Sequence, residues 1–325
     1  MKNFAYINAD SIKSVVSHLG KSSLALAGGT DLLNLLKDYV VDVDSLVNVK
    51  DVESLVGIEV GGSGARIGAA TKIADLLSHD GLRKSYPALT EALWEIGTPQ
   101  IRNMGTLGGN LCARPRCWYF RRDGFDCLKR GGPACGALEG DNEFHAIFGT
   151  GQKCVMVHPS SAAPALIAYG AKARVSGPSG QREVPIEGFF TLPAANIYAE
   201  NVLTPSEVLT DIVIPPNQGK SATYEVRHKE SHDWPLALAS VVLQLDGNTV
   251  SDARICLGAV APIPWRVKEA EAVLKGKAVT DELAAEAGAK AVGAAKPLSQ
   301  NNYKVQLTRT AVKRAIIAAA TGRRV

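Results

Sequence analysis

Several features that would assign a protein to a common class are missing from this 325-residue sequence. No run of eighteen apolar residues is present, so we expect no membrane-spanning helix. The first ten residues, MKNFAYINAD, lack the apolar segment of a secretory signal peptide. These two absences predict a cytoplasmic protein, which would reach the periplasm only with a partner that carries a signal.

Aromatic residues make up only 6% of the chain, and the formal net charge is a modest +4. Because no long basic run accompanies this charge, the composition indicates no binding to nucleic acid. Glycine is plentiful, with 31 residues, and 46% of the chain is hydrophobic. This composition favours a protein of helices and strands with many tight turns and a large core, divided into two or three domains.

Motifs of several well-known sites are also absent. A G-x-G-x-x-G motif after a strand would indicate a Rossmann nucleotide site, and G-x-x-x-x-G-K-[ST] would indicate a P-loop, but neither occurs. The cysteines form no C-x-x-C pair, and His145 and His158 stand alone in the sequence. We therefore find no nucleophile and base paired for hydrolysis or group transfer.

The order of apolar segments predicts strands and helices in alternation. Strands are expected at 24–27, 45–49, 65–70, 236–245 and 253–260, and helices at 10–20, 71–81, 86–97, 281–295 and 304–320. A strand, a turn, a helix and a second strand are expected in turn over 155–177. Pro215 and Pro216 indicate a boundary. We expect an α/β unit at 1–57, a second at 58–216 and a C-terminal α+β domain at 217–325.

Two glycine-rich loops are candidates for a binding site. Consecutive glycines permit positive φ, so that successive N–H groups point into one concavity suited to a phosphate. Two such loops suggest a diphosphate held from two sides, although each loop alone is equally well explained as an ordinary turn. The candidate residues are Ala27, Gly28, Gly29, Thr30, Asp31 and Leu32 in the first loop, and Gly105, Thr106, Gly108, Gly109 and Asn110 in the second.

Four motifs, AGGTDLL, RIGAATKIADL, IRNMGTLGGNL and HPSSAAPALIAYGA, occur in this order, followed by DWPLALASVVL and NNYKVQLTRTAVKRAI. With them the chain resembles, over nearly its full length, the FAD-binding medium subunit of the molybdenum hydroxylase (xanthine dehydrogenase) family. The resemblance implies an α+β fold. A vanillyl-alcohol-oxidase-type FAD-binding domain of two α/β subdomains would be followed by a small C-terminal α+β domain of the molybdenum hydroxylase flavoprotein type.

The same resemblance implies roles for individual residues. The two glycine loops would hold the diphosphate and ribityl of FAD, and Ser160 and Ser161 would contact the flavin. Family members often have H-P-S-D at this motif, whereas this chain has H-P-S-S at 158–161, so a carboxylate is missing. Trp234 would lie near the isoalloxazine ring, although a core tryptophan is an equally good interpretation. Lys229 would approach the flavin as a positive charge, although an exposed lysine is the simpler interpretation.

An insert of about forty residues, at 112–154, contains four cysteines in the pattern C-x9-C-x7-C-x18-C. It resembles the insert of two branches of the family, the hydroxybenzoyl-CoA reductases and the periplasmic aldehyde oxidoreductases, with spacing most like the latter. Both carry an additional [4Fe-4S] cluster. The ligands implied by the resemblance are Cys117, Cys127, Cys135 and Cys154. The many basic residues at 112–135 would offset the negative charge of such a cluster.

Other roles for these cysteines stay open. Zinc is usually bound by closely paired cysteines, and disulfides require an oxidising compartment. A nucleic-acid finger would leave the two glycine loops unexplained. Cys112 is expected to pack or to lie near a cofactor, and Cys256 is expected in a core.

The resemblance implies electron transfer within a heterotrimer. The partners would be a large molybdopterin-binding subunit and a small subunit with two [2Fe-2S] clusters. Bound FAD would pass electrons between iron–sulfur clusters and an external acceptor or donor, with aldehyde oxidation as the expected reaction. Alternatives are the equivalent subunit of a CoA-ester reductase, a stand-alone flavin oxidase, and a zinc-stapled binding module without flavin.

Overall fold

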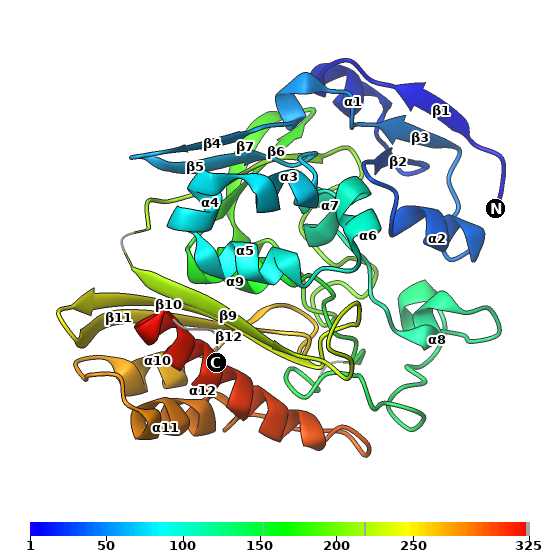
Figure 1. Ribbon diagram of the computed structural model, residues 1–325. Coiled ribbons are helices and arrows are strands. Elements are labelled where there is room, and N and C mark those ends of the chain that lie inside the picture. The colour runs from blue at the N-terminus through cyan, green and yellow to red at the C-terminus, as the bar shows by residue number, and fades with distance from the viewer. Residues whose placement is uncertain (152, 218, 323–325) are drawn as a thin grey trace.

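The computed structural model describes residues 1–151, 153–217 and 219–322, which form three sheets with helices between and around them (Figure 1). The first sheet is parallel, in the order β1-β3-β2, and its strands are β1 (Ala5–Asn8), β2 (Ser23–Leu26) and β3 (Ser45–Asn48). Its connections contain α1 (Ile12–His18) and α2 (Leu32–Lys37). The Ser11 side chain accepts a hydrogen bond from the N–H of Ser14 and caps α1.

The second sheet joins strands that are far apart in the sequence, in the order β4-β5-β8-β6-β7, with every neighbouring pair antiparallel. Its strands are β4 (Ile58–Gly61), β5 (Gly64–Gly68), β6 (Lys172–Gly177), β7 (Gly180–Pro185) and β8 (Val208–Ile214). Strand β8 lies at the centre of this sheet, so the segment just before Pro215 is fixed to the rest of the second sheet.

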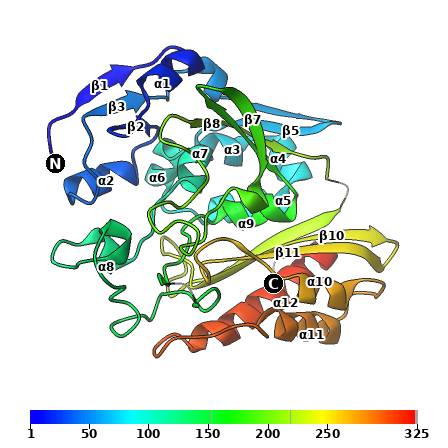
Figure 2. The ribbon, with the colours of Figure 1, turned by 180° about the vertical axis from the view of Figure 1, so that it is seen from behind.

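The third sheet is antiparallel in the order β12-β11-β10-β9 and is covered on one face by helices (Figures 1 and 2). Its strands are β9 (Lys220–Val226), β10 (Ala237–Asp246), β11 (Thr249–Gly258) and β12 (Trp265–Arg266), and the helices are α10 (Lys268–Leu274), α11 (Asp281–Ala291) and α12 (Tyr303–Thr321). Helix α12 buries Ala311, Val312 and Ala315, whose three- and four-residue spacing places them on one side of the helix.

Helices fill the space between the second and third sheets. They are α3 (Ile73–Ser78), α4 (Asp80–Ser85), α5 (Pro87–Trp94), α6 (Pro99–Met104), α7 (Leu107–Leu111) and α9 (Ala162–Ala168). Every residue of α9 is buried, and its sequence AAPALIA allows close contact with β10 and β11. Ile212 of the second sheet and Val242 of the third belong to one core with α5 and α9. The second and third sheets are therefore packed as one body around these helices.

In its described residues the insert contains little regular structure, namely α8 (Trp118–Arg121) and a 3₁₀ turn at Leu128–Arg130. Two further 3₁₀ turns lie at Glu53–Leu55 and Ile186–Gly188. Insert residues Phe120 and Cys127 pack against Leu35 of α2, so the insert lies beside α2 (Figure 2). Among the described residues, no helix combines the length and the apolar character that crossing a membrane requires.

Most predicted elements are confirmed, but the strand expected at the start of 155–177 is wrong. Val155 and Met156 are buried, and the hydrogen bonds of this segment go to single residues, from Ala146 N–H to Val155 O and from His158 N–H to Ala261 O. These contacts form no ladder. The apolar residues at the start of 155–177 therefore indicate that the segment is buried, but not that it is a strand. A short apolar run of this kind does not distinguish a strand from a buried connection.

Candidate functional site

The two glycine-rich loops lie next to each other along one cleft of about 650 Å³. Residues 27–32 and the segment 105–110 line it together with Trp234 and Ser161, which come from much later in the chain. A volume of this size lies within the range of cofactor pockets. The cleft therefore joins residues that the sequence could only suggest separately.

The first loop needs both of its glycines. Gly29 has φ +72°, which favours glycine, and a Cβ on Gly28 would lie 1.9 Å from the carbonyl oxygen of Met104. Met104 directly precedes the second loop, so the two loops touch at this point. A side chain at Gly28 would push them apart.

The second loop is fixed by its own hydrogen bonds. Thr106 accepts one at 3.1 Å from the N–H of Gly109 and caps α7. Gly108 donates its N–H to Ala69 O at 2.8 Å, and a Cβ at Gly108 would lie 2.8 Å from the same oxygen. The absence of side chains therefore lets this backbone lie directly against the segment after β5.

Two of the predicted cofactor residues do not line the cleft. Ser160 is buried and donates a hydrogen bond to Asn110 Oδ1 at 2.6 Å, so it supports the second loop from behind. Lys229 lies outside the lining and is exposed, as the simpler interpretation predicted, with its backbone N–H bonded to Asp233. The other thirteen line it: Ala27, Gly28, Gly29, Thr30, Asp31, Leu32, Gly105, Thr106, Gly108, Gly109, Asn110, Ser161 and Trp234.

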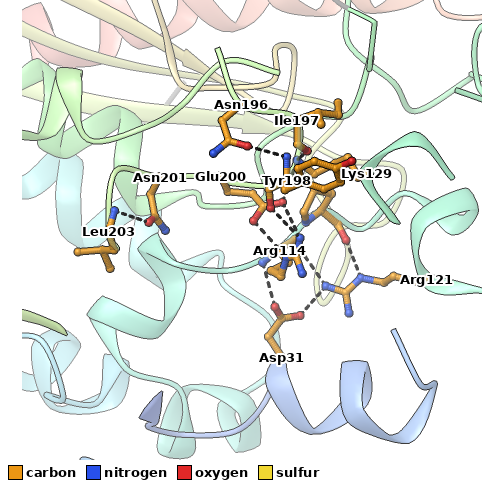
Figure 3. Close-up of polar contacts among 11 residues, drawn as sticks. Asp31, Arg114, Arg121, Lys129, Asn196, Ile197, Tyr198, Glu200, Asn201 and Leu203 are labelled. Atoms are coloured by element: carbon orange, nitrogen blue, oxygen red, sulfur yellow. Dashed lines mark hydrogen bonds and ion pairs between the residues drawn. The ribbon is translucent and has the colours of Figure 1, made fainter. Parts of the chain in front are cut away.

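Asp31 connects the first glycine loop to the insert (Figure 3). Its carboxylate pairs with Arg121 Nη2 at 2.6 Å and with Arg116 Nη1 at 3.3 Å, and it accepts a hydrogen bond from the Arg114 N–H at 3.0 Å. The sequence predicts Asp31 in the FAD loop but gives no sign of this role, because its partners lie more than 80 residues away.

Glu200 makes a second anchor for the insert (Figure 3). Its carboxylate accepts hydrogen bonds from Arg114 at 3.1 and 3.3 Å and forms an ion pair of 3.1 Å with Lys129. The Lys129 side chain is 1% exposed and also donates to Ile197 O at 2.7 Å. The basic residues of the insert were expected to offset the negative charge of an iron–sulfur cluster. Arg114, Arg121 and Lys129 instead pair with carboxylates of the surrounding chain.

The four cysteines of the insert lie near one another. The side chains of Cys135 and Cys154 share a hydrogen bond, which lowers the pKa of Cys135 to about 6 and raises that of Cys154. Burial raises the pKa of Cys117 to about 12, and Cys127 and Cys135 are close enough to raise it further. All four are free thiols. In the described residues no three His, Cys, Asp or Glu side chains are arranged to hold a metal ion.

The other two cysteines behave as hydrophobic residues. Cys256 is fully buried in the core between the second and third sheets, as predicted. Cys112 lines the cleft, and burial raises its pKa to about 12. A thiol with such a pKa stays protonated near neutral pH, so Cys112 contributes an apolar wall.

His145 contacts the cysteine group from the side of the third sheet. Its Nε2 lies 3.2 Å from Cys117 Sγ, and its ring packs edge-on against Trp118. Burial lowers the pKa of His145 to about 4, so the ring is neutral. Its carbonyl oxygen accepts hydrogen bonds from Asn301 at 3.1 Å and from Lys304 at 3.2 Å. Asn301, just before α12, and Lys304, in its first turn, thus hold the backbone of the insert at His145.

The residues of the cleft fit the FAD that the resemblance implies, whereas the four insert cysteines, as they are placed, form no metal site among the described residues. The cleft is lined by the backbone of two adjacent glycine loops and has space for a dinucleotide, as an FAD site requires. Four thiols held by one insert are the donor set of an iron–sulfur cluster.

Comparison with known proteins supports the flavin site. Residues 2–217 match the family described as FAD binding domain in molybdopterin dehydrogenase, and residues 222–319 match the CO dehydrogenase flavoprotein C-terminal domain. The chain is 33% identical to the aldehyde oxidoreductase FAD-binding subunit PaoB of Escherichia coli, over 95% of this chain and 96% of that protein. It is 31% identical to the carbon monoxide dehydrogenase medium chain of Hydrogenophaga pseudoflava, over 94% and 92%.

The fold agrees with these relatives. A chain of the solved carbon monoxide dehydrogenase from Hydrogenophaga pseudoflava superimposes with a TM-score of 0.78 at 29% identity, covering 98% of this chain and 97% of that one. The α+β fold expected from the sequence is therefore confirmed. Matches over nearly the whole chain, together with a cleft lined by two glycine loops, show that this protein belongs to the FAD-binding subunits of the molybdenum hydroxylase family.

Proposed function

We propose that this chain is the FAD- and [4Fe-4S]-containing electron-transfer subunit of a heterotrimeric molybdenum hydroxylase that oxidises aldehydes. Its partners would be a large molybdopterin-binding subunit and a small [2Fe-2S] subunit. Bound FAD supplies the chemistry that joins one-electron carriers to a two-electron acceptor. The similarity to an aldehyde oxidoreductase subunit over 95% of the chain supports the choice of reaction.

The observation that carries the proposal is the connection between the cleft and the cysteine insert. Asp31, on the first glycine loop, pairs with Arg121 and Arg116, and Arg116 directly precedes Cys117. One network of ion pairs therefore fixes both candidate cofactor sites relative to each other. Electron transfer between two cofactors requires such a fixed arrangement, whereas a separate zinc staple does not.

Within this proposal each part of the chain has its own task. Segments 1–57 and 58–216 form the two halves of the FAD cleft, and 217–325 is the C-terminal domain that closes it through Trp234. Gly28 and Gly29 would present backbone N–H groups to the FAD diphosphate, whereas the N–H groups of Gly108 and Gly109 are bonded within the protein. Cys117, Cys127, Cys135 and Cys154 would bind the cluster as thiolates, so binding would release their protons.

Metal and flavin analysis of the anaerobically purified chain tests the proposal. We expect about four irons and four acid-labile sulfides per chain, with one FAD. Cys127→Ser and Cys135→Ser should lose the iron and keep the FAD, while the control Cys256→Ala, in the core, should keep both.

Three results would contradict the proposal in different ways. Zinc without iron would make the insert a structural staple. Iron that is retained in both serine variants would place the metal elsewhere. A chain without FAD, in a preparation whose fold is intact by circular dichroism, would remove the flavin role itself.

A further inference from the structure

A glutamate of the C-terminal domain lies directly behind the wall of the FAD cleft. Glu225, on β9, has a side chain that is only 2% exposed, and its Oε2 accepts a hydrogen bond from Ser161 Oγ at 3.2 Å. Ser161 lines the cleft, at the start of α9. The carboxyl group is thus separated from the cofactor space by a single hydroxyl group.

The charges around Glu225 are incompletely matched. Arg227 is the cation beside it, but Arg227 Nε lies 3.8 Å from Glu225 Oε1, whereas Arg227 Nη2 lies 2.6 Å from Glu95 Oε2. Among the described residues Glu225 Oε1 has no hydrogen-bond partner. Burying a carboxyl group with a free oxygen is unfavourable, so packing alone does not explain why a glutamate occupies this position.

The hydrogen bond to Glu225 determines what Ser161 can offer to a ligand. A serine hydroxyl has one hydrogen and two acceptor lone pairs. Because the hydrogen points to Glu225, the lone pairs are left for a donor in the cleft. The ribityl hydroxyls and the ring N–H of a flavin are donors of this kind.

We propose that Glu225 is a positioning residue of the FAD cleft, which orients the Ser161 hydroxyl so that it accepts a hydrogen bond from the bound flavin. The inference rests on FAD binding in this cleft. It also gives β9 of the C-terminal domain a part in cofactor binding, and it supplies a carboxyl group beside the H-P-S-S segment, which contains none of its own.

A double-mutant cycle on the full chain tests the proposal, with the FAD dissociation constant read from flavin fluorescence. Ser161→Ala should weaken FAD binding about 3- to 10-fold, since one neutral hydrogen bond is lost. Glu225→Leu should weaken it by a similar factor, and Glu225→Gln by less, because the amide oxygen still accepts from Ser161. In the Ser161→Ala background both Glu225 substitutions should have no further effect.

The control is Glu183→Gln, which changes a glutamate of β7 that pairs with Lys172 and Arg174 outside the cleft and should leave FAD binding unchanged. Additive effects of Ser161→Ala and Glu225→Leu, or unchanged binding in Glu225→Leu, would overturn the proposal. If Glu225→Leu does not fold, the double-mutant cycle is measured with Ser161→Ala and Glu225→Gln. Additive effects of these two substitutions on the FAD dissociation constant would then overturn the proposal. A wild-type chain that binds no FAD would instead contradict the proposed function.

Discussion

The guanidinium of Arg116 lies over the indole ring of Trp234, 4.4 Å from its centroid. Arg116 belongs to the cysteine insert and Trp234 to the C-terminal domain, and both line the FAD cleft. Trp234 is 49% exposed, so the core interpretation of this residue is wrong. Stacking of this kind contributes about 0.5–2 kcal/mol, depending on how far the pair is desolvated.

Trp234→Ala is expected to weaken FAD binding about 10-fold, because a wall of the cleft and the support of Arg116 are lost together. Arg116→Lys should have a smaller effect in the same direction, since lysine keeps the charge but not the planar stacking. The FAD dissociation constant measures both. Trp94→Ala is the matched control, because Trp94 is similarly exposed and stacks with Arg102 outside the cleft. Equal losses of FAD affinity in Trp94→Ala and Trp234→Ala would show that both substitutions act through a general loss of stability.

Asp31→Asn is expected to loosen the insert, because Arg121 and Arg116 lose their shared carboxylate. Leaving partly buried arginines without a counter-charge costs about 1–3 kcal/mol. Limited proteolysis should therefore cleave within 114–135 faster than in the wild type, and iron should be lost sooner. Asp281→Asn removes an exposed pair with Lys313 and serves as control. An insert that resists protease unchanged in Asp31→Asn would argue against this anchor.

Lys304 predicts a pH-dependent contribution to stability. Its side chain is buried and donates to the carbonyls of Phe144, His145 and Ala259, and burial lowers its pKa from 10.5 to about 7. Between these values the unfolded chain binds more protons than the folded one, so this contribution to stability increases as pH rises from about 7 to 10.5. It is lost as pH falls toward 7.

Lys304→Met should be less stable than the wild type, since carbonyls are left unpaired. In urea unfolding experiments the difference in free energy of unfolding should be larger at about pH 9.5 than at about pH 7. The exposed Lys275→Met is the control and should show no such trend. A difference that stays constant with pH would mean that Lys304 remains fully charged in the folded protein.

His145→Phe is expected to make the proposed cluster more labile, because the ring packing against Trp118 is kept while the contact of Nε2 with Cys117 is lost. Loss of a group that contacts a metal ligand without binding the metal itself typically changes metal affinity about 10- to 100-fold. Iron release to a chelator, followed by absorbance, should be faster by a factor in this range. His18→Phe on the exposed face of α1 is the control. Iron release at the wild-type rate in His145→Phe would exclude this role.

Features that depend on neighbouring residues could be predicted from the amino-acid sequence. Gly28 and Gly29 lie between a strand and a helix, and a turn there requires their conformational freedom whatever surrounds it. The four motifs and their order could likewise be recognised from the sequence, and they identified the family. Each motif is a short segment whose backbone conformation depends on its own residues. The spacing of Cys117 to Cys154 resembles that of family branches with an additional cluster, and the ligand set that this resemblance implies stays a prediction.

Which distant residues meet depends on the tertiary structure. Ser161 and Glu225 are 64 positions apart, Asp31 and Arg121 are 90 apart, and His145 and Asn301 are 156 apart. Hydrogen bonds and ion pairs of this kind carry no local periodicity, because they form only when packed sheets and helices bring the groups within about 3 Å. The loops of the FAD cleft were therefore predictable, whereas the network that links the cleft to the cysteine insert was not.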